Sequence, residues 1–210
     1  MIKIVKGAEP QEWIAKKRTP GFTDYEPIPE LRAALLKDQG FICGYCMRRI
    51  PVVKNDPGNI ERSKIEHVQS REHFQHLQLE YSNMIICCPG FINSNEHCDK
   101  LKKSSPISFS PFDVNVERSI SYGSKDGKIS SSNMDWNKDF NNVLALNNSL
   151  LKLNRKQALE GVRLRLQQKN WRKAELESIL NEWKSKDADG KLKPYCGVII
   201  WYINRKLKIS

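Results

Sequence analysis

Long hydrophobic runs are absent from this chain of 210 residues. The longest extends only from Val198 to Ile203, whereas a membrane-spanning helix needs roughly 20 apolar residues. The N-terminal residues also lack the apolar core of a signal peptide. These absences predict a cytoplasmic protein that does not enter a membrane.

Acidic residues are few relative to basic ones. Lys and Arg total 35 and Asp and Glu total 24, which gives a formal net charge of +11. A charge of this size favours a polyanionic partner such as nucleic acid. Hydrophobic residues make up 39% of the sequence, as in ordinary folded proteins, and we find no internal repeat or low-complexity tract. We therefore expect a folded, basic protein.

The composition changes along the chain and predicts three regions of an α+β protein. Residues 1–40 are expected to form a helical leader, with helices at residues 10–17 and 28–38. Residues 41–105 hold five of the six cysteines and all four histidines. Residues 106–210 are expected to form a hairpin followed by a mainly helical region.

The elements of the third region follow from local patterns. Residues 119–122 and 128–131 flank Gly-Ser-Lys-Asp-Gly and predict the two strands of the hairpin. Helical periodicity begins at Asn137, and it leaves open whether one long helix or two follow. Pro194 is suited to open a last buried helix that runs through Trp201.

Cysteine spacing predicts a structural metal site in the second region. Cys43 and Cys46 form Cys-Gly-Tyr-Cys, a tight knuckle that can direct two thiolates at one ion, with Gly44 easing the turn. A second pair must complete the tetrahedron, and we choose Cys88 and Cys98. Structural Zn²⁺ bound by these four thiolates would order a module that has little core of its own.

Other assignments of the cysteines remain open at this point. Cys87 or His97 could replace one of the four ligands, and Cys87 is otherwise expected to be a small buried side chain. Cys196 lies alone in an apolar run and is expected to be a packed thiol. A redox-active CxxC would need a βαβ context, which the sequence does not provide.

A pair of chemically useful side chains lies between the cysteine pairs. Residues 64–68, Lys-Ile-Glu-His-Val, predict a short strand on which Glu66 and His67 point to opposite faces. Asn83-Met84 precedes Cys88, and Asp99 follows Cys98 at the start of a basic helix.

The order of these elements resembles that of the HNH, or ββα-metal, endonucleases in their zinc-bound form. The matching elements are Cys43 with Cys46, Glu66-His67, Asn83-Met84, Cys88, and Cys98-Asp99. They cover about a third of the chain. The resemblance implies an α+β fold with a central zinc-stapled ββα module, N-terminal helices and a mainly helical C-terminal region. It also implies a metal-dependent hydrolase that cleaves phosphodiester bonds.

The resemblance assigns a role to each residue of the catalytic set. His67 is the general base that takes a proton from water, which then attacks the scissile phosphate. Glu66 and Asp99 hold a catalytic Mg²⁺ or Mn²⁺ ion, and Asn83 hydrogen-bonds backbone across the ββ loop. The family usually has Asn or His in place of Asp99, so the extra negative charge is expected to tighten metal binding and to repel phosphate somewhat. His97 is an alternative to Asp99 as the ligand.

Basic residues follow the last ligand. Lys100, Lys102 and Lys103 are expected to contact phosphates that flank the cut, and residues 163–173 extend this basic track.

A narrower resemblance concerns the biological setting. The Glu-His pair, the stretch 146–159 with Asn154-Arg155, and the overall size are similar to the HNH subunits of Septu-type and retron-associated anti-phage systems. Such subunits work beside an ABC/SMC-like ATPase subunit, in some systems with a retron reverse transcriptase and its DNA. The expected substrate is DNA. Transfer RNA is an alternative substrate, and a zinc-stapled nucleic-acid-binding module with an idle Glu-His pair is an alternative of another class.

Overall fold

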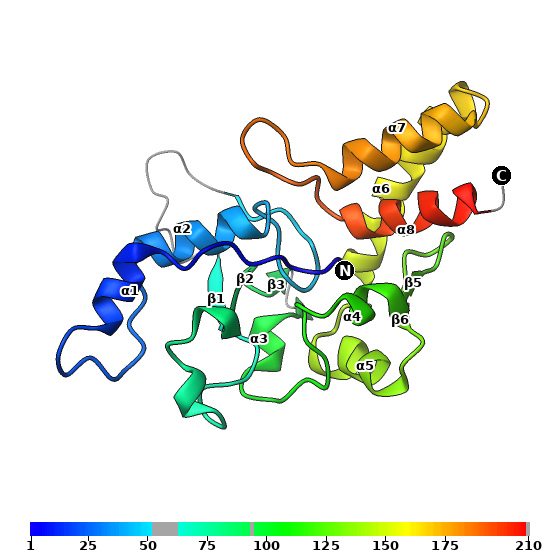
Figure 1. Ribbon diagram of the computed structural model, residues 1–210. Helices are drawn as coiled ribbons and strands as arrows, with labels where there is room; N and C mark the ends of the chain where they lie inside the picture. Colours follow the sequence, from blue (N-terminus) through cyan, green and yellow to red (C-terminus); the bar gives the residue numbers. More distant parts are fainter. Residues whose placement is uncertain (52–62, 93–94, 209–210) are drawn as a thin grey trace.

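The computed structural model describes residues 1–51, 63–92 and 95–208. The predicted module 41–105 therefore includes two stretches, 52–62 and 93–94, that lie outside the described residues. Within the described ranges the chain is mixed α/β, with short helices and three two-stranded antiparallel sheets (Figure 1). The elements are α1 (Gln11–Lys17), α2 (Pro29–Asp38), β1 (Lys64–His67), η1 (Gln75–Leu77), η2 (Tyr81–Asn83), β2 (Met84–Cys87), β3 (Phe91–Ile92), β4 (Asn95–Glu96), α3 (Asp99–Lys102), α4 (Val114–Ser119), β5 (Ile120–Tyr122), β6 (Ile129–Ser131), α5 (Met134–Lys138), η3 (Asp139–Val143), α6 (Ser149–Gln168), α7 (Lys173–Lys184) and α8 (Cys196–Leu207).

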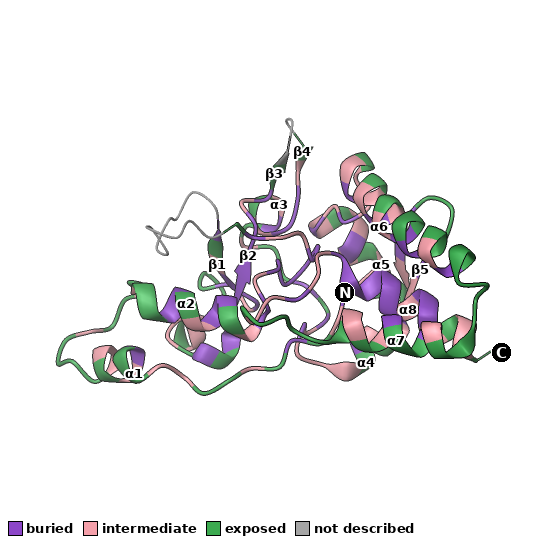
Figure 2. Cartoon of the chain, turned by 90° about the horizontal axis from the view of Figure 1, so that it is seen from above, coloured by how far each residue is buried: buried purple, intermediate pink, exposed green. Residues whose placement is uncertain are grey.

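The hydrophobic core runs through the molecule as one cluster, which extends along the chain from Met1 to Ile203. Figure 1 shows α1 and α2 at one end, β1, β2 and α3 in the middle, and α4 to α8 at the other end. Most of β2 and α8 is buried (Figure 2). The N-terminal ammonium of Met1 donates a hydrogen bond to the Tyr122 hydroxyl of β5, so the first residues of the chain are tied to the C-terminal elements.

The two predicted N-terminal helices are confirmed. Pro29 occupies the first turn of α2, where its missing N–H has no helical partner to lose. Leu31 and Leu35, four residues apart, place the apolar face of α2 in the core. This face packs near β2 and fixes one side of the central hairpin.

The central hairpin pairs β1 with β2 in antiparallel register. Glu66 lies opposite Ile85, and His67 lies opposite Met84. All four residues of β2 are buried, as expected for an apolar strand covered on both faces. The polar side chains of this hairpin that could take part in a reaction, Glu66 and His67, therefore both come from β1.

The third region matches its predicted elements closely. The hairpin is confirmed as β5 paired with β6, and Asn148 caps α6 by accepting a hydrogen bond from the Leu151 backbone N–H at 2.9 Å. Two helices follow, because the chain turns between α6 and α7 at Asn170 and Trp171, which both have positive φ. The last helix begins at Cys196 and continues beyond Trp201 to Leu207, so the expectation that Pro194 opens it is wrong: Pro194 lies in a turn before the N-cap residue Tyr195. None of the helices described here has the length and apolar character to cross a bilayer.

Gly40, the last residue of the first region, contacts the third region. It follows α2 with φ +59°, and its carbonyl accepts a hydrogen bond from the Leu192 backbone N–H at 3.0 Å. A Cβ atom at Gly40 would lie 2.6 Å from Leu192 Cγ and 2.8 Å from its backbone nitrogen. The position thus requires glycine both for its conformation and for the close approach.

We expect Gly40→Ala to lower the free energy of unfolding by about 3 kcal/mol, because the left-handed strain adds to the clash with Leu192. Gly21→Ala is the matched control: Gly21 has φ +80°, but no atom lies within 4 Å of the added Cβ. This control should lose about 1 kcal/mol. Urea unfolding of both variants makes the comparison, and equal losses would show that Leu192 does not restrict this position.

Candidate functional site

The thiols of Cys43, Cys46, Cys88 and Cys98 meet at one point in the core. Their sulfur atoms all lie within 4.8 Å of one another, with 3.8 Å between Cys43 and Cys98 and 3.7 Å between Cys46 and Cys88. These separations exceed the bond of a disulfide, about 2.05 Å. They match the edge of a tetrahedron with Zn–S bonds of about 2.3 Å, which is about 3.8 Å. The four cysteines form a candidate site for a structural metal such as zinc.

Backbone contacts hold the first cysteine pair against β2. Between Cys43 and Cys46, the Gly44 N–H donates to the Ile86 carbonyl at 3.0 Å. The Gln39 side chain extends this contact, because its amide nitrogen donates to Ile86 O at 2.8 Å and its oxygen accepts from Ile86 N at 2.7 Å. The knuckle is therefore positioned by strand-like hydrogen bonds.

The second pair comes from the ends of two elements. Cys88 follows β2 directly, and Cys98 precedes α3. The Cys98 N–H donates to the Leu144 carbonyl at 2.9 Å, which connects this ligand to the segment after η3. A metal held by these thiols would join β2, α3 and the knuckle at one point.

The alternatives left open by the sequence lie beside the cluster. His97 Nε2 is 3.6 Å from Cys88 Sγ, but the group of four mutually close ligand atoms consists of cysteines alone. Burial raises the pKa of the Cys87 thiol well above its ordinary value and that of Cys196 to about 11. Both are thus packed as neutral thiols.

Glu66 is a buried carboxylate with three polar neighbours. Its Oε1 atom is 2.8 Å from the Lys102 ammonium and accepts a hydrogen bond from the Tyr45 hydroxyl at 3.1 Å. The Asp99 carboxyl lies close enough to raise the pKa of Glu66. Burial, reinforced by Asp99 and opposed by Lys102, raises the pKa of Glu66 to about 8. The site therefore concentrates acidic groups beyond what its single ammonium balances.

His67 is held in one tautomer. Its Nε2 atom lies 2.9 Å from the Gln78 carbonyl, which can only accept, so Nε2 carries the proton. The ring packs edge-on against Tyr25 at 4.6 Å between centroids. Burial lowers the pKa of His67 to about 4. The imidazole is thus neutral near pH 7, with its lone pair on Nδ1.

Asn83 fixes the loop that follows β1. Its side-chain oxygen accepts from the Gln69 N–H at 2.9 Å, and its amide nitrogen donates to the Gln69 carbonyl at 2.9 Å and to the Leu77 carbonyl at 3.3 Å. The Asn83 carbonyl accepts from Val68 N at 2.9 Å. These contacts set the path of the chain immediately after His67.

Three of the predicted catalytic residues line one cavity of about 320 Å³: Glu66, His67 and Asp99. Glu66 and His67 are adjacent on a strand, and their side chains have different partners: Glu66 contacts Lys102 and Tyr45, whereas His67 contacts the Gln78 carbonyl. Both residues nevertheless line this cavity. Basic side chains that also line it are Lys64, Arg71 and Lys103. No protein-family model and no curated protein matches the chain.

The prediction for Lys102 as a phosphate contact is wrong. Its side chain has no exposed surface, and its ammonium is bound to Glu66, so it cannot reach a phosphate at the surface. Lys100 and Lys103 are exposed, as expected. Lys102 lies three residues after Asp99 on a helix, and that spacing is the signal that would have placed it on the same inward face.

Tyr45 is a site residue that sequence reasoning missed. It stands inside the Cys-Gly-Tyr-Cys knuckle and is completely buried. Burial and the nearby Glu66 raise the pKa of Tyr45 well above its ordinary value, so the hydroxyl remains a donor to Glu66. Through this hydrogen bond the Cys43–Cys46 knuckle also positions the Glu66 carboxyl.

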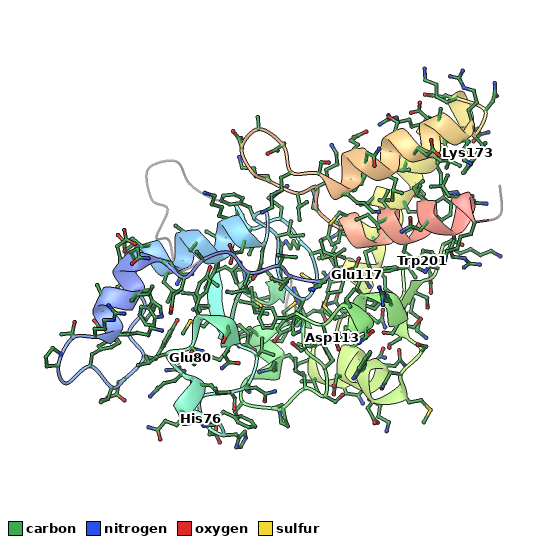
Figure 3. All side chains as sticks on the ribbon, in the orientation of Figure 1. His76, Glu80, Asp113, Glu117, Lys173 and Trp201 are labelled. Atoms are coloured by element: carbon green, nitrogen blue, oxygen red, sulfur yellow. The ribbon has the colours of Figure 1, made fainter. Side chains whose placement is uncertain are left out.

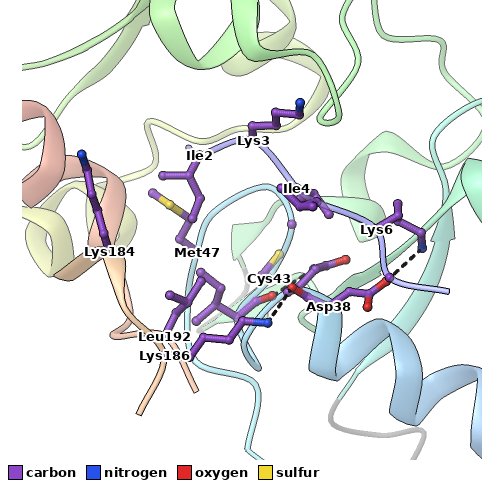
Figure 4. Close-up of a pocket in the computed structure, with 15 residues that line it drawn as sticks. Ile2, Lys3, Ile4, Lys6, Asp38, Cys43, Met47, Lys184, Lys186 and Leu192 are labelled. Carbon is purple, nitrogen blue, oxygen red and sulfur yellow. Dashed lines mark hydrogen bonds and ion pairs between the residues drawn. The ribbon is translucent and has the colours of Figure 1, made fainter. Parts of the chain in front are cut away.

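A second cavity, of about 350 Å³, includes Cys43 in its lining (Figure 4). Asp38 lines this cavity, and its carboxylate forms an ion pair with the Lys6 ammonium at 3.9 Å. Its backbone carbonyl accepts a hydrogen bond from the Lys186 ammonium at 3.2 Å. The Tyr81 hydroxyl donates to the Asp38 carboxylate at 2.7 Å. Asp38 therefore connects the N-terminal segment with the loop after α7.

We expect Cys98→Ser to reduce the bound zinc well below one ion per chain and to unfold the central hairpin, because three thiolates and a weakly acidic hydroxyl cannot replace the four-sulfur site. Cys87→Ala is the matched control, since Cys87 neighbours a ligand without belonging to the cluster. Elemental analysis with circular dichroism gives the result. Full zinc content in Cys98→Ser would exclude this ligand set.

We expect Lys102→Met to lower the free energy of unfolding by about 3–5 kcal/mol, because it leaves Glu66 and Asp99 facing each other without their cation. Lys100→Met serves as the control; Lys100 is exposed and should change stability by less than about 0.5 kcal/mol. Urea unfolding at pH 7 measures both. Equal stability of the two variants would mean that Lys102 does not balance the buried carboxylates.

Proposed function

We propose that the chain is a metal-dependent HNH-type endonuclease whose ββα-metal module consists of β1, β2 and α3. The observation that supports this most is the meeting of Glu66, His67 and Asp99 at one cavity beside the four-cysteine cluster. The order of the motifs along the chain, an acidic residue with histidine on the first strand and a second acid at the start of the helix, agrees with that family. Lys64, Arg71 and Lys103 of the cavity lining, which also includes Glu72, offer cations to a phosphodiester.

In this proposal His67 is the general base. With Nε2 bound to the Gln78 carbonyl, Nδ1 is the nitrogen that accepts a proton from water. The water oxygen forms a bond to phosphorus as the bond from phosphorus to the 3′-oxygen breaks, and the leaving oxygen takes a proton from solvent. The low pKa of His67 keeps the base unprotonated at cellular pH, although it also makes it a weak base.

Glu66 and Asp99 would hold the catalytic ion. The donor set fits a divalent cation, because two carboxyl groups line the same cavity beside a single ammonium, and a bound cation would displace the proton that the raised pKa keeps on Glu66 near pH 7. Bound there, Mg²⁺ or Mn²⁺ would stabilise the charge on the phosphorane and on the leaving 3′-oxygen. Tyr45 and Lys102 both approach Oε1 of Glu66, which leaves its second oxygen for the ion.

The substrate and setting remain proposals that rest on the resemblance and on charge. We propose DNA as the substrate and transfer RNA as the alternative, since both offer the phosphate geometry that such a site recognises. We further propose that the protein is a cytoplasmic effector of an anti-phage system, beside an ABC/SMC-like ATPase subunit and in some systems a retron reverse transcriptase with its DNA. The net charge of +11 is consistent with a nucleic-acid partner.

We expect His67→Ala to reduce cleavage of plasmid DNA or total RNA in Mn²⁺ by about 10²–10⁴-fold, with zinc content and fold unchanged. His76→Ala is the matched control, because His76 lies on η1 at the surface, away from the cavity (Figure 3). Both are assayed with and without the ATPase subunit, because the isolated chain can depend on it to receive substrate.

Three outcomes are decisive. Loss of cleavage in His67→Ala alone supports the proposed base. Cleavage that persists in His67→Ala excludes that role. Binding of nucleic acid with no cleavage by the unaltered protein, even with the ATPase subunit, would favour a zinc-stapled binding module instead.

A further inference from the structure

Aromatic rings and cationic groups alternate on one face of α8. Trp201 and Tyr202 belong to α8, and Trp171 lies in the turn between α6 and α7. The Lys206 ammonium is 5.5 Å from the centre of the Trp171 ring and 5.7 Å from that of Tyr202. The Arg205 guanidinium lies 5.2 Å from the centre of the Trp201 ring. We call these five residues the α8 surface.

Two cavities open on the α8 surface and share Trp201 and Arg205. One, of about 590 Å³, lies between α4, β5 and α8, and the other, of about 140 Å³, lies beside Tyr202. The basic residues that line them are Arg118, Arg205, Lys206 and Lys208. Figure 3 shows Trp201 of α8 and Glu117 of α4 on this side of the molecule. The two cavities thus share a wall formed by Trp201 and Arg205, and we call them together the α8 hollow.

The charge of this hollow is strongly positive. Glu117 is the acidic residue among those that line the two cavities, and its carboxylate already accepts a hydrogen bond from the Lys3 backbone N–H at 2.9 Å. Arg163, exposed on α6, lies close enough to Tyr202 to act on it electrostatically. Positive potential focused in a hollow attracts anions that carry several charges.

The backbone is strained where it presents Trp171. Asn170 and Trp171 have φ values of +51° and +54°, and consecutive left-handed residues other than glycine are unfavourable. Trp171 in this strained turn has 37% of its surface exposed to solvent and lies beside Lys206. Strain of this kind is commonly retained at binding sites, whereas glycine would serve a turn that only connects two helices.

We infer that the α8 surface binds single-stranded nucleic acid. Unpaired bases can stack on Trp171, on the partly exposed Trp201 and on the Arg205 plane, while the neighbouring cations contact the phosphates. A duplex keeps its bases stacked within itself and cannot use the rings in this way. The surface lies on α8 at one end of the molecule, whereas β1 lies in the middle (Figures 1 and 2), so it is a second contact and does not depend on hydrolysis.

The test is fluorescence anisotropy of a labelled single-stranded DNA of about 12 nucleotides, titrated with the full chain. All variants are made in the His67→Ala background and assayed without chelator, so that neither cleavage nor loss of structural metal alters the result. Arg205→Glu is the main variant. Arg18→Glu is its matched control, because Arg18 is exposed at the end of α1 and the change in net charge is identical. Trp171→Ala tests stacking, and circular dichroism verifies that each variant is folded.

We expect Arg205→Glu to raise Kd at least tenfold, Trp171→Ala to raise it about 5- to 100-fold, and Arg18→Glu to change it less than twofold. Unlabelled single strand should displace the probe well before duplex of equal length does. Equal Kd values for Arg205→Glu and Arg18→Glu, equally effective competition by duplex, or no binding of either nucleic acid would each overturn the inference. Cleavage assays on Arg205→Glu with His67 intact separate such a failure from a failure of the nuclease proposal.

Discussion

The rest of the site depends on the meeting of four cysteine thiols inside the hydrophobic core. Several groups of the neighbouring site are linked to this cluster by a short stretch of chain or by strand pairing. Tyr45 lies within the first ligand pair, and Asp99 follows Cys98 directly. β2, which pairs with the strand of Glu66 and His67, runs straight into Cys88. A metal bound there would hold both strands and the start of α3, replacing the large core that so short a hairpin cannot build.

Charge balance is the second constraint on this region. A fully buried ammonium between two acidic groups is stable only because the partners are within hydrogen-bond distance, and Lys102 meets this requirement at 2.8 Å from Glu66. The same arrangement keeps one oxygen of Glu66 engaged, and burial beside Asp99 raises the pKa of Glu66 to about 8, so its carboxyl is largely protonated near pH 7. His67, in contrast, is neutral and held by the Gln78 carbonyl. An acidic group beside a neutral base is the combination that hydrolysis of a phosphodiester by a metal-activated water requires.

Much of the fold could be predicted because it follows from local patterns. The periodicity of Leu31 and Leu35, the turn residues of the β5–β6 hairpin, and the CxxC spacing each act over a few residues. The break between α6 and α7 was left open, since Asn170 alone is a weak helix-termination signal without glycine or proline and Trp171 is not a usual left-handed residue.

Only part of the candidate site could be predicted, for the same reason. The four clustered cysteines and the convergence of Glu66, His67 and Asp99 follow from motif order. The buried state of Lys102 was missed because a run of lysines is ordinarily solvated, and only the contact with Glu66 from a distant strand makes burial favourable. Tyr45 was missed because its partner is 21 residues away in sequence. Pairings of this length are properties of the folded chain and leave no local signal.

X-ray absorption at the zinc K-edge of the purified protein tests the central claim most directly. A first shell of four sulfur atoms at about 2.3 Å is the predicted result. A shell dominated by nitrogen or oxygen, or protein that is folded with no bound metal, would contradict it.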